Sequence, residues 1–196
     1  MPNSELPTRS TSQVTAEPRR LFVALWPDAG LQGKLHALGS ELLVGNRGRR
    51  IPPENLHLTL AFLGHVNAER QTCLEREVSV IRLPAFTLTL DQVGLWPRNG
   101  LLWAGGTPPA ALLALVHGIN QGLRACGLEP ETRPFQVHLT LARNVRGLHL
   151  DRDHAITPLA WKVSQFALVA SWTLPTGARY EILKTWRLEN GQDLQD

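Results

Sequence analysis

The sequence predicts a chain of both helices and strands, built as a duplication in which two similar sheets face one another across a cleft. The first observation is the pentapeptide His-Leu-Thr-Leu-Ala, which occurs at residues 57–61 and returns unchanged at residues 138–142. The second is that polar and apolar residues alternate in both copies, and an extended strand sends every second side chain to the same face. The third is that strand–helix–strand patterns recur in both halves of the chain. A cleft between the two repeat strands is therefore the expected site.

Length and composition favour one compact domain or two small lobes. The chain has 196 residues, of which 43% are hydrophobic, so it can bury a core of its own. The apolar runs are short and the N-terminus lacks the apolar block of a secretory signal, so we expect a cytoplasmic protein with no membrane segment. Two cysteines, Cys73 and Cys126, are too few for a disulfide framework or a cysteine-built zinc site, and we expect them to be reduced thiols.

The charge of the chain favours an anionic partner. The formal net charge is +3 and the pI is near 9.3, well below what a protein that coats nucleic acid usually needs. Almost all the basic residues are arginine, whose planar guanidinium can bind a phosphate group with two hydrogen bonds, although an arginine-rich genome would produce the same bias. A small ligand that carries phosphate therefore fits best.

The first half of the chain predicts alternating strands and helices after a disordered tail at residues 1–18. Short apolar runs are typical of buried strands, and Asp28 and Asn67 can each cap a helix. The basic stretch at residues 45–50 is expected to be a loop, and residues 52–55 a turn. The predicted elements are a strand at 20–26, a helix between Asp28 and Gly45, the first repeat strand ending near Gly64, a helix from Asn67 to about Ile81, and a strand at 85–93.

The second half predicts one helix and several strands. Residues 96–100 have the composition of a hairpin turn, and Pro108 and Pro109 can open a helix that Gly127 stops. The predicted elements are a strand at 101–105, the helix with an apolar stripe of Leu112, Leu115, Val116, Ile119 and Leu123, the second repeat strand from about Phe135, and strands at 161–172 and 179–188. We therefore expect one bilobal domain over residues 19–196, with repeat halves of roughly 19–95 and 96–188.

Two His-x-Thr motifs about eighty residues apart, with matching flanks, resemble those of the two-histidine phosphoesterases. The flanks are Leu-Phe-Val-Ala-Leu-Trp-Pro at residues 21–27 and Pro-Pro-Glu-Asn-Leu before the first histidine, whereas Val137 stands where the family often has proline. Within this superfamily the chain looks most like the RNA 2′,3′-cyclic phosphodiesterases, also called the 2′-5′ RNA ligase family. The resemblance covers roughly residues 19–188.

The resemblance implies an α+β fold that is bilobal, with a pseudo-two-fold duplication, two mainly antiparallel sheets that flank a central cleft, and helices on the outside. It also implies an enzyme that hydrolyses a terminal RNA or nucleoside 2′,3′-cyclic phosphate to a 2′-phosphomonoester without a metal or another cofactor. The expected partners are RNA ends or small cyclic nucleotides, and we expect a monomer.

Hydrolysis of a cyclic phosphodiester needs a base for the attacking water and an acid for the leaving ribose oxygen. Two histidines, with a reference pKa near 6.5, can supply both. By resemblance His57 is the proton donor and His138 the proton acceptor, an order that the symmetry of the repeat alone leaves open. Thr59 and Thr140 can donate hydrogen bonds to the non-bridging phosphate oxygens. Arg143 resembles the phosphate-contacting arginine of the family, but strand alternation places it opposite Thr140, so a bend is required.

Other polar and aromatic residues have two readings. The basic stretch could steer RNA, although a charge run is usually a solvated face, and the tryptophans could stack on a base, although most are expected in the core. The remaining histidines have no carboxylate partner at ligand spacing, so we expect no metal site. These residues are Arg47, Arg49 and Arg50, then Trp26, Trp96, Trp103, Trp161, Trp172 and Trp186, and finally His36, His65, His117, His149 and His154.

Two alternative functions remain open at this point. A non-catalytic module that binds nucleotides or RNA ends could have the same fold, although the intact His and Thr in both motifs argue against it. A ligase-like activity that forms 2′-5′ linkages would run the reaction in reverse through the same two histidines.

Overall fold

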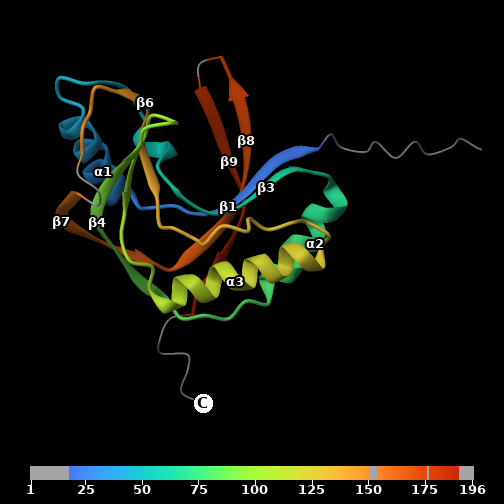
Figure 1. Ribbon diagram of the computed structural model, residues 1–196. Helices are drawn as coiled ribbons and strands as arrows, with labels where there is room; N and C mark the ends of the chain where they lie inside the picture. Colours follow the sequence, from blue (N-terminus) through green and yellow to red (C-terminus); the bar gives the residue numbers. More distant parts are fainter. Residues whose placement is uncertain (1–17, 151–153, 176, 190–196) are drawn as a thin grey trace, which may run out of the picture.

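The computed structural model describes residues 18–150, 154–175 and 177–189, so the tail predicted at residues 1–18 lies almost wholly outside the described residues. Strands and helices share one fold (Figure 1), which confirms the predicted α+β class. The helices are α1 (Ala29–Leu42), the short 3₁₀ helix η1 (Pro53–Asn55), α2 (Ala68–Ser79) and α3 (Ala110–Ala125). The strands are β1 (Arg19–Leu25), β2 (Arg47–Arg50), β3 (Leu58–Val66), β4 (Phe86–Trp96), β5 (Leu101–Gly105), β6 (Leu139–Arg146), β7 (His154–Val163), β8 (Gln165–Leu174) and β9 (Gly177–Arg187).

The strands form one sheet in which the paired strands are antiparallel. The order across the sheet is β7-β4-β5-β6-β3-β1-β8-β9, and β2 also pairs with β6. The two strands that carry the repeat, β3 and β6, lie at the centre and are joined by the pair of Leu58 with Leu139. These leucines hold the same position in the two repeats. The two sheets expected from the sequence are thus the two halves of one sheet, which meet at equivalent residues.

Each half of the sheet takes strands from both halves of the chain. Outward from the centre, β6 is followed by β5, β4 and β7, and β3 is followed by β1, β8 and β9. Strand β4 belongs to the first half of the chain but lies between β5 and β7 of the second half. Strands β8 and β9 come from the C-terminal part, yet β8 lies beside β1, with β9 on its far side. The strands on either side of the central pair β3 and β6 therefore come from parts of the chain that are far apart in the sequence.

The sheet curls until its two halves meet again at Ser164. This residue alone separates β7 from β8, although these strands belong to opposite halves of the sheet, and its carbonyl accepts a hydrogen bond of 2.8 Å from the Leu188 backbone N–H. The single strand predicted at 161–172 is therefore wrong: strand-forming apolar residues lie on both sides of the break, and no glycine or proline marks it. The sequence prediction also missed residues 154–160, which contain Pro158. A proline is tolerated there because β7 is an edge strand.

The helices cover the sheet with the apolar faces that their spacing predicts. Asp28 caps α1 by accepting the Leu31 backbone N–H at 2.9 Å, and Asn67 caps α2 in the same way with Arg70. The predicted stripe of α3 is buried, and this helix lies against β3 and β4 while α2 packs beside it (Figure 1). Helix α1 contacts β6 and β2 instead. Within the described ranges, none of these helices is long and apolar enough to cross a membrane.

Two expectations from the sequence, one about residues 47–50 and one about the two cysteines, are wrong. Residues 47–50, predicted as part of a loop, form β2, because β6 offers them a free edge on which backbone hydrogen bonds can form.

Cys73 and Cys126, predicted as reduced thiols, form a disulfide with a Cα–Cα distance of 5.8 Å. Cys73 lies on α2 and Cys126 ends α3, so the packing of these two helices brings together residues that are 53 positions apart in the sequence.

Candidate active site between the two repeat strands

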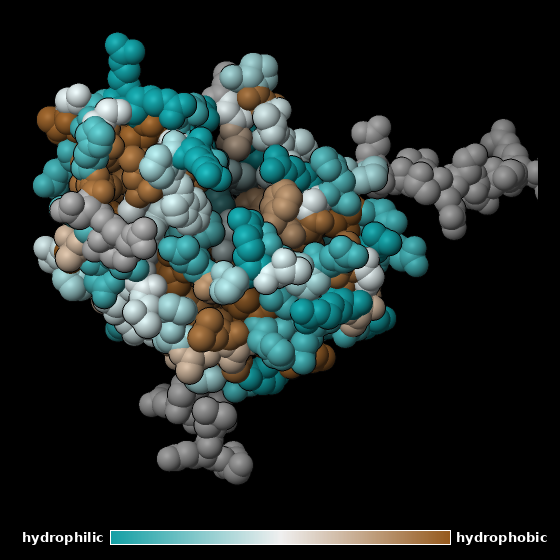
Figure 2. Space-filling view, in the orientation of Figure 1, coloured by the Kyte–Doolittle hydropathy of each residue, from teal (hydrophilic) through white to brown (hydrophobic). Residues whose placement is uncertain are grey.

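The two repeats open on one small cavity of about 110 Å³. Thr59 lines it from β3 and Thr140 from β6, and His57 and His138, which also line it, are the residues that immediately precede these two strands. The sequence predicted that each histidine would share a face with its threonine, and both pairs lie as predicted because the leucines between them are buried. Figure 2 shows the surface hollowed below the β8–β9 hairpin, between the two halves of the sheet.

Arg143 also lines this cavity, through a bulge in β6. Thr140 and Ala142 lie opposite consecutive residues of β5, so Leu141 is an extra residue in the pairing. One extra residue shifts the alternation of side chains by one, which brings Arg143 to the face of Thr140. The bend that the sequence prediction required is therefore present.

Strand β3 has the same bulge at the equivalent position. Thr59 and Ala61 lie opposite consecutive residues of β1, so Leu60 is the extra residue. The residue that follows the repeat is Phe62 here and Arg143 in β6. Both side chains line cavities at the site, but one is an aromatic ring and the other a cation. The duplicated strands therefore present different chemistry on their two sides.

Backbone carbonyls fix the orientation of both histidine rings. The Nδ1 atom of His57 lies 2.8 Å from the Asn55 carbonyl oxygen, and that of His138 lies 2.9 Å from the Gln136 carbonyl oxygen. A carbonyl can only accept, so Nδ1 must carry the proton that it donates. The Nε2 atom is then the nitrogen left for proton transfer in each ring. Sequence reasoning missed these partners because a backbone oxygen two residues upstream has no signature in residue type.

Aromatic rings surround His57. Trp26 is stacked on it with a centroid distance of 4.9 Å and an interplanar angle of 10°, and its indole N–H donates to the Glu54 carbonyl at 3.1 Å. The centroids of Phe22 and Tyr180 each lie 5.0 Å from that of His57. The sequence indicated Trp26 only as one of six tryptophans that could stack on a base, and it did not indicate Phe22 or Tyr180 as site residues, since Trp26 and Phe22 lie on or just after a strand that has the pattern of the core.

This setting lowers the pKa of His57 to about 4. Burial of the ring is the main cause, because burial disfavours the charged form, and the positive charges of Arg143 and His138 act in the same direction. The hydrogen bond to the Asn55 carbonyl raises the pKa but does not offset the other effects. In the protein without substrate, His57 is therefore neutral at pH 7.

Different aromatic residues lie next to His138. Its ring lies 5.0 Å from that of Trp96, which in turn lies 5.8 Å from the buried Trp103. Trp103 crosses the backbone of Gly94 on the next strand, where a Cβ atom would come within 2.2 Å of the indole. Only glycine leaves room for this ring. The aromatic support of His138 thus depends on one small residue.

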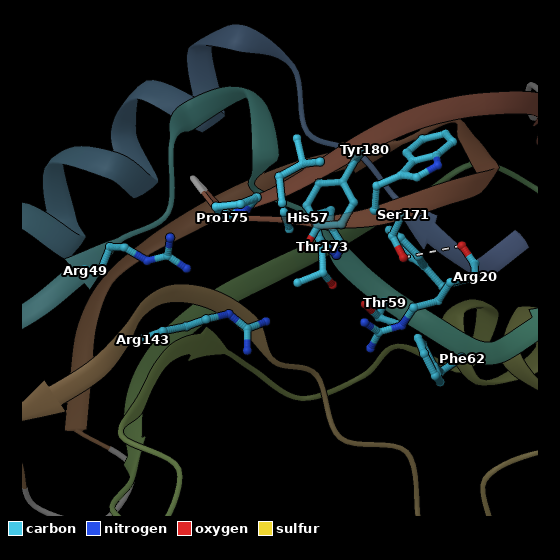
Figure 3. A pocket seen from close by; sticks show the side chains of 15 residues that line it. Arg20, Arg49, His57, Thr59, Phe62, Arg143, Ser171, Thr173, Pro175 and Tyr180 are labelled. Carbon is cyan, nitrogen blue, oxygen red and sulfur yellow. Dashed lines mark hydrogen bonds between the residues drawn. The ribbon is translucent and has the colours of Figure 1, made fainter.

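A larger cavity of about 450 Å³ opens from the small one. The two share His57, Thr59, Arg143 and Tyr180. Figure 3 shows Arg143 and Arg49 on one side of the larger cavity and Arg20 with Phe62 on the other. Of the basic stretch considered from the sequence, Arg49 lines this cavity; Arg47 and Arg50 do not, and Arg50 donates to the Ser40 hydroxyl at 2.9 Å instead.

The remaining candidates separate into site and core. Trp26 and Trp96 lie against the two histidines and Trp172 lines a different part of the larger cavity, whereas Trp103 and Trp161 are buried and Trp186 stacks on Phe166. The His36 Nδ1 atom lies 3.2 Å from a backbone carbonyl. In the described part of the chain, no group of three or more His, Cys, Asp or Glu side chains is arranged to hold a metal ion.

The site can be compared with those of known proteins. A family model described as LigT like Phosphoesterase matches residues 25–103 and 106–180. The RNA 2′,3′-cyclic phosphodiesterase of Escherichia coli is 35% identical over 180 residues, which cover 88% of this chain and 98% of that protein. The protein of the same name from Archaeoglobus fulgidus is 28% identical and covers 85% of this chain and 99% of its own length.

Solved structures give the same result. The chain is similar to Escherichia coli LigT in its apo form, with a TM-score of 0.77, and in complex with 3′-AMP, with a TM-score of 0.78; both are 35% identical, and each match covers 88% of this chain and 99% of the other. TT0787 of Thermus thermophilus is 28% identical, with the same coverage and a TM-score of 0.71.

Proposed function

The chain belongs to the LigT-like phosphoesterase family, and from this we propose that it hydrolyses a terminal 2′,3′-cyclic phosphate of RNA or of a nucleoside to a 2′-phosphomonoester. The observation that carries the proposal is that both His-x-Thr pairs and Arg143 line one cavity. Two proton-transfer groups, two hydroxyl donors and a fixed cation are the groups that opening a cyclic phosphodiester requires.

The reaction needs one proton removed and one supplied. His138 takes a proton from the attacking water through Nε2 as the water oxygen bonds to phosphorus. His57 gives a proton through Nε2 to the 3′-oxygen as its bond to phosphorus breaks, which leaves a 3′-hydroxyl and a 2′-phosphate. Thr59 and Thr140 donate hydrogen bonds to the non-bridging oxygens, where negative charge accumulates, and Arg143 stabilises the same charge.

The low pKa of His57 constrains this assignment. A neutral ring cannot donate the proton, so His57 must be protonated in the complex with substrate. The phosphodiester anion supplies the reason: it offsets the charge of Arg143, which lowers the pKa of His57 in the free protein, and it stabilises an adjacent imidazolium. We infer that substrate binding and proton uptake by His57 are coupled.

The test is turnover of adenosine 2′,3′-cyclic phosphate followed by phosphorus NMR. We expect a 2′-phosphomonoester, with a rate that falls on the order of 10²–10⁴-fold in His57→Ala and in His138→Ala. His65→Ala is the matched control, because His65 lies on β3 but lines neither cavity. A new 2′-5′ linkage instead of a monoester would indicate the ligase reaction, and tight binding without any turnover would indicate a binding module.

We also propose that the protein acts as a monomer in the cytoplasm on RNA ends or small cyclic nucleotides. The support for a monomer is that one chain supplies every group named in the reaction. Analytical ultracentrifugation at the protein concentration of the activity assay tests this, and a dimer in which the partner chain contributes residues to the site would contradict it.

The location in the cytoplasm has its own test. The disulfide is more typical of an oxidising compartment, so cells are fractionated and the thiol state of Cys73 and Cys126 is measured in each fraction.

A further inference from the structure

The larger cavity exceeds what the reacting phosphate needs. Both histidines, both threonines and Arg143 already line the small cavity. The larger cavity has about four times the volume of the small one, and neither His138 nor Thr140 lines it. Its volume of about 450 Å³ lies in the range of sites for whole small molecules. It extends from the reacting centre toward Arg20 on β1 and toward the end of β8. The larger cavity therefore has room for parts of the substrate beyond the reacting phosphate.

The charge of this cavity indicates a second phosphate. Three arginines line it, and no Asp or Glu is among the described residues that do. Arg49 and Arg143 are cross-strand partners and lie on the side of the reacting phosphate. Arg20 lies across the cavity from them (Figure 3), and it forms no ion pair with the described residues. One guanidinium therefore remains for an anion other than the reacting one.

Neighbouring residues hold Arg20 in place. Its guanidinium lies over the Phe62 ring, 4.9 Å from the centroid, which is a favourable arrangement for a cation and an aromatic face. Its backbone pairs with Ser171 of β8, whose hydroxyl donates to the Arg20 carbonyl at 3.3 Å. The contact with Phe62 restricts the guanidinium of this exposed arginine to the edge of the cavity.

Exposed aromatic rings provide the other half of a nucleotide site. Phe62 and Trp172 are 49% and 37% exposed, and they are the exposed aromatic side chains among the large hydrophobic residues that the structure describes. Both line this cavity. Arg179 lies over the Trp172 ring at 5.8 Å, which leaves the indole held but accessible. Aromatic faces next to a guanidinium are the combination that binds single-stranded nucleotides through stacking and charge.

We propose that the part of the larger cavity lined by Arg20, Phe62 and Trp172, which we call the upstream subsite, binds the nucleotide on the 5′ side of the one that carries the cyclic phosphate. Arg20 pairs with the phosphate that links the two nucleotides, and the upstream base stacks on Trp172, while Phe62 holds the Arg20 guanidinium. The inference rests on the proposed function and makes it narrower: the preferred substrate is the 3′ end of an oligonucleotide, whereas a single cyclic nucleotide leaves the part of the larger cavity next to Arg20 empty.

The experiment compares adenosine 2′,3′-cyclic phosphate with the dinucleotide ApA that ends in a 2′,3′-cyclic phosphate. We expect kcat/KM to be about tenfold or more higher for the dinucleotide, as one charge-assisted contact and one stacked base would give. Arg20→Gln and Trp172→Ala should each remove most of this advantage and change kcat/KM for the single nucleotide by less than about twofold. Trp172→Phe, which keeps a stacking face, should retain most of it.

Arg19→Gln is the matched control, because Arg19 is the neighbouring arginine on β1 but lines neither cavity. It removes the same charge from the chain and should leave the preference for the dinucleotide unchanged. The salt dependence gives a second readout: each phosphate contact to a single strand adds a slope of about 0.7 in log affinity against log salt. The dinucleotide should therefore be the more salt-sensitive substrate in the wild type and in Arg19→Gln, but not in Arg20→Gln.

Equal losses on both substrates in Arg20→Gln would overturn the inference, because the cavity would then hold the terminal nucleotide itself. Equal kcat/KM for the two substrates in the wild type would overturn it as well. If the protein hydrolysed neither the cyclic mononucleotide nor the cyclic dinucleotide, the proposed function would fail. The upstream subsite would then be tested by binding: ApA with a 3′-phosphate and adenosine with a 3′-phosphate are titrated into the protein, and tryptophan fluorescence is the signal. Equal affinity for these two ligands would overturn the inference independently of turnover.

Discussion

At the scale of single residues, the two histidines have the same local sequence and different surroundings. His57 is enclosed by Trp26, Phe22 and Tyr180, whereas His138 contacts Trp96. The identical pentapeptide supplies the backbone geometry of both, and distant strands supply the environment. The acid and the base can therefore be told apart by experiments on each residue.

The leaving group of the substrate separates the two roles. An acid is needed when the leaving oxygen is strongly basic, so a diester with a 4-nitrophenolate leaving group needs little protonation. We expect His57→Ala to recover most of its lost rate with this diester, provided that the phenolate occupies the place of the 3′-oxygen, and His138→Ala to recover none. Rate measurements on both substrates check this. Rescue of His138→Ala instead would exchange the roles, and equal losses on both substrates would indicate positioning.

The pKa of His57 also predicts how stability depends on pH. In the unfolded chain the ring binds a proton as the pH falls below 6.5, whereas in the folded protein it stays neutral until about pH 4. Protons therefore favour the unfolded state in this window. Since one pKa unit corresponds to about 1.4 kcal/mol, folding should be about 3 kcal/mol less favourable at pH 4 than above pH 6.5 on account of this residue.

Urea unfolding of the wild type and of His57→Ala between pH 4 and pH 7 measures this effect. Other groups titrate in both proteins, so the quantity of interest is the difference between the two curves. We expect the wild type to lose about 3 kcal/mol more than the variant as the pH falls. Parallel curves would show that the ring titrates alike in the folded and unfolded states.

At the scale of elements, the alternation of polar and apolar residues predicted which side chains of the repeat share a face but not where the alternation breaks. The Leu141–Ala142 step in β6 is apolar on both sides, so residue type contains no sign of the bulge. Pairing with β5 reveals it, and with it the position of Arg143. In the same way β2 forms because β6 is adjacent, although its sequence of Arg and Gly favours a loop. Both features depend on a neighbouring strand, which local sequence does not encode.

The disulfide between α2 and α3 gives a prediction at the same scale. Closing a loop of 53 residues restricts the unfolded chain and stabilises the fold by at most about 4 kcal/mol. We expect the paired change of Cys73→Ala and Cys126→Ala to lower the free energy of unfolding by a large part of this amount, and a reductant to have a comparable effect on the wild type only. The urea midpoint with and without dithiothreitol measures both. An unchanged wild-type midpoint on complete reduction would contradict the prediction.

At the scale of the whole molecule, the sequence predicted the fold class, the three helices and the shared cleft, because each follows from local periodicity and from the repeat. The order of strands could not be predicted in the same way. The predicted turn at residues 96–100 does indicate that β4 lies beside β5. That β5 lies beside β6 and that β8 lies beside β1 depends on which surfaces pack together once the chain has returned, in the second case over more than a hundred residues. No glycine or proline near Ser164 marks the point where the chain passes from one half of the sheet to the other.

The mechanism as a whole requires no metal. The two imidazoles, two hydroxyls and one guanidinium of the small cavity supply proton transfer and charge stabilisation between them. We expect exhaustive dialysis against EDTA to leave turnover of the cyclic nucleotide unchanged. A loss of turnover that a divalent ion restores would contradict this, and His65→Ala treated in parallel serves as a control for damage during dialysis.

The position of β1 in the sheet has a consequence for synthesis on the ribosome. This first strand is flanked by β3, which follows soon after, and by β8, which begins at Gln165. At translation rates of about 5–20 residues per second, one edge of β1 waits on the order of ten seconds for its partner. A nascent chain arrested before β8 should thus expose an apolar strand edge that chaperones can bind. Protease digestion of ribosome-bound chains of increasing length should show protection of β1 only once β8 has left the exit tunnel; earlier protection would mean that another segment covers this edge first.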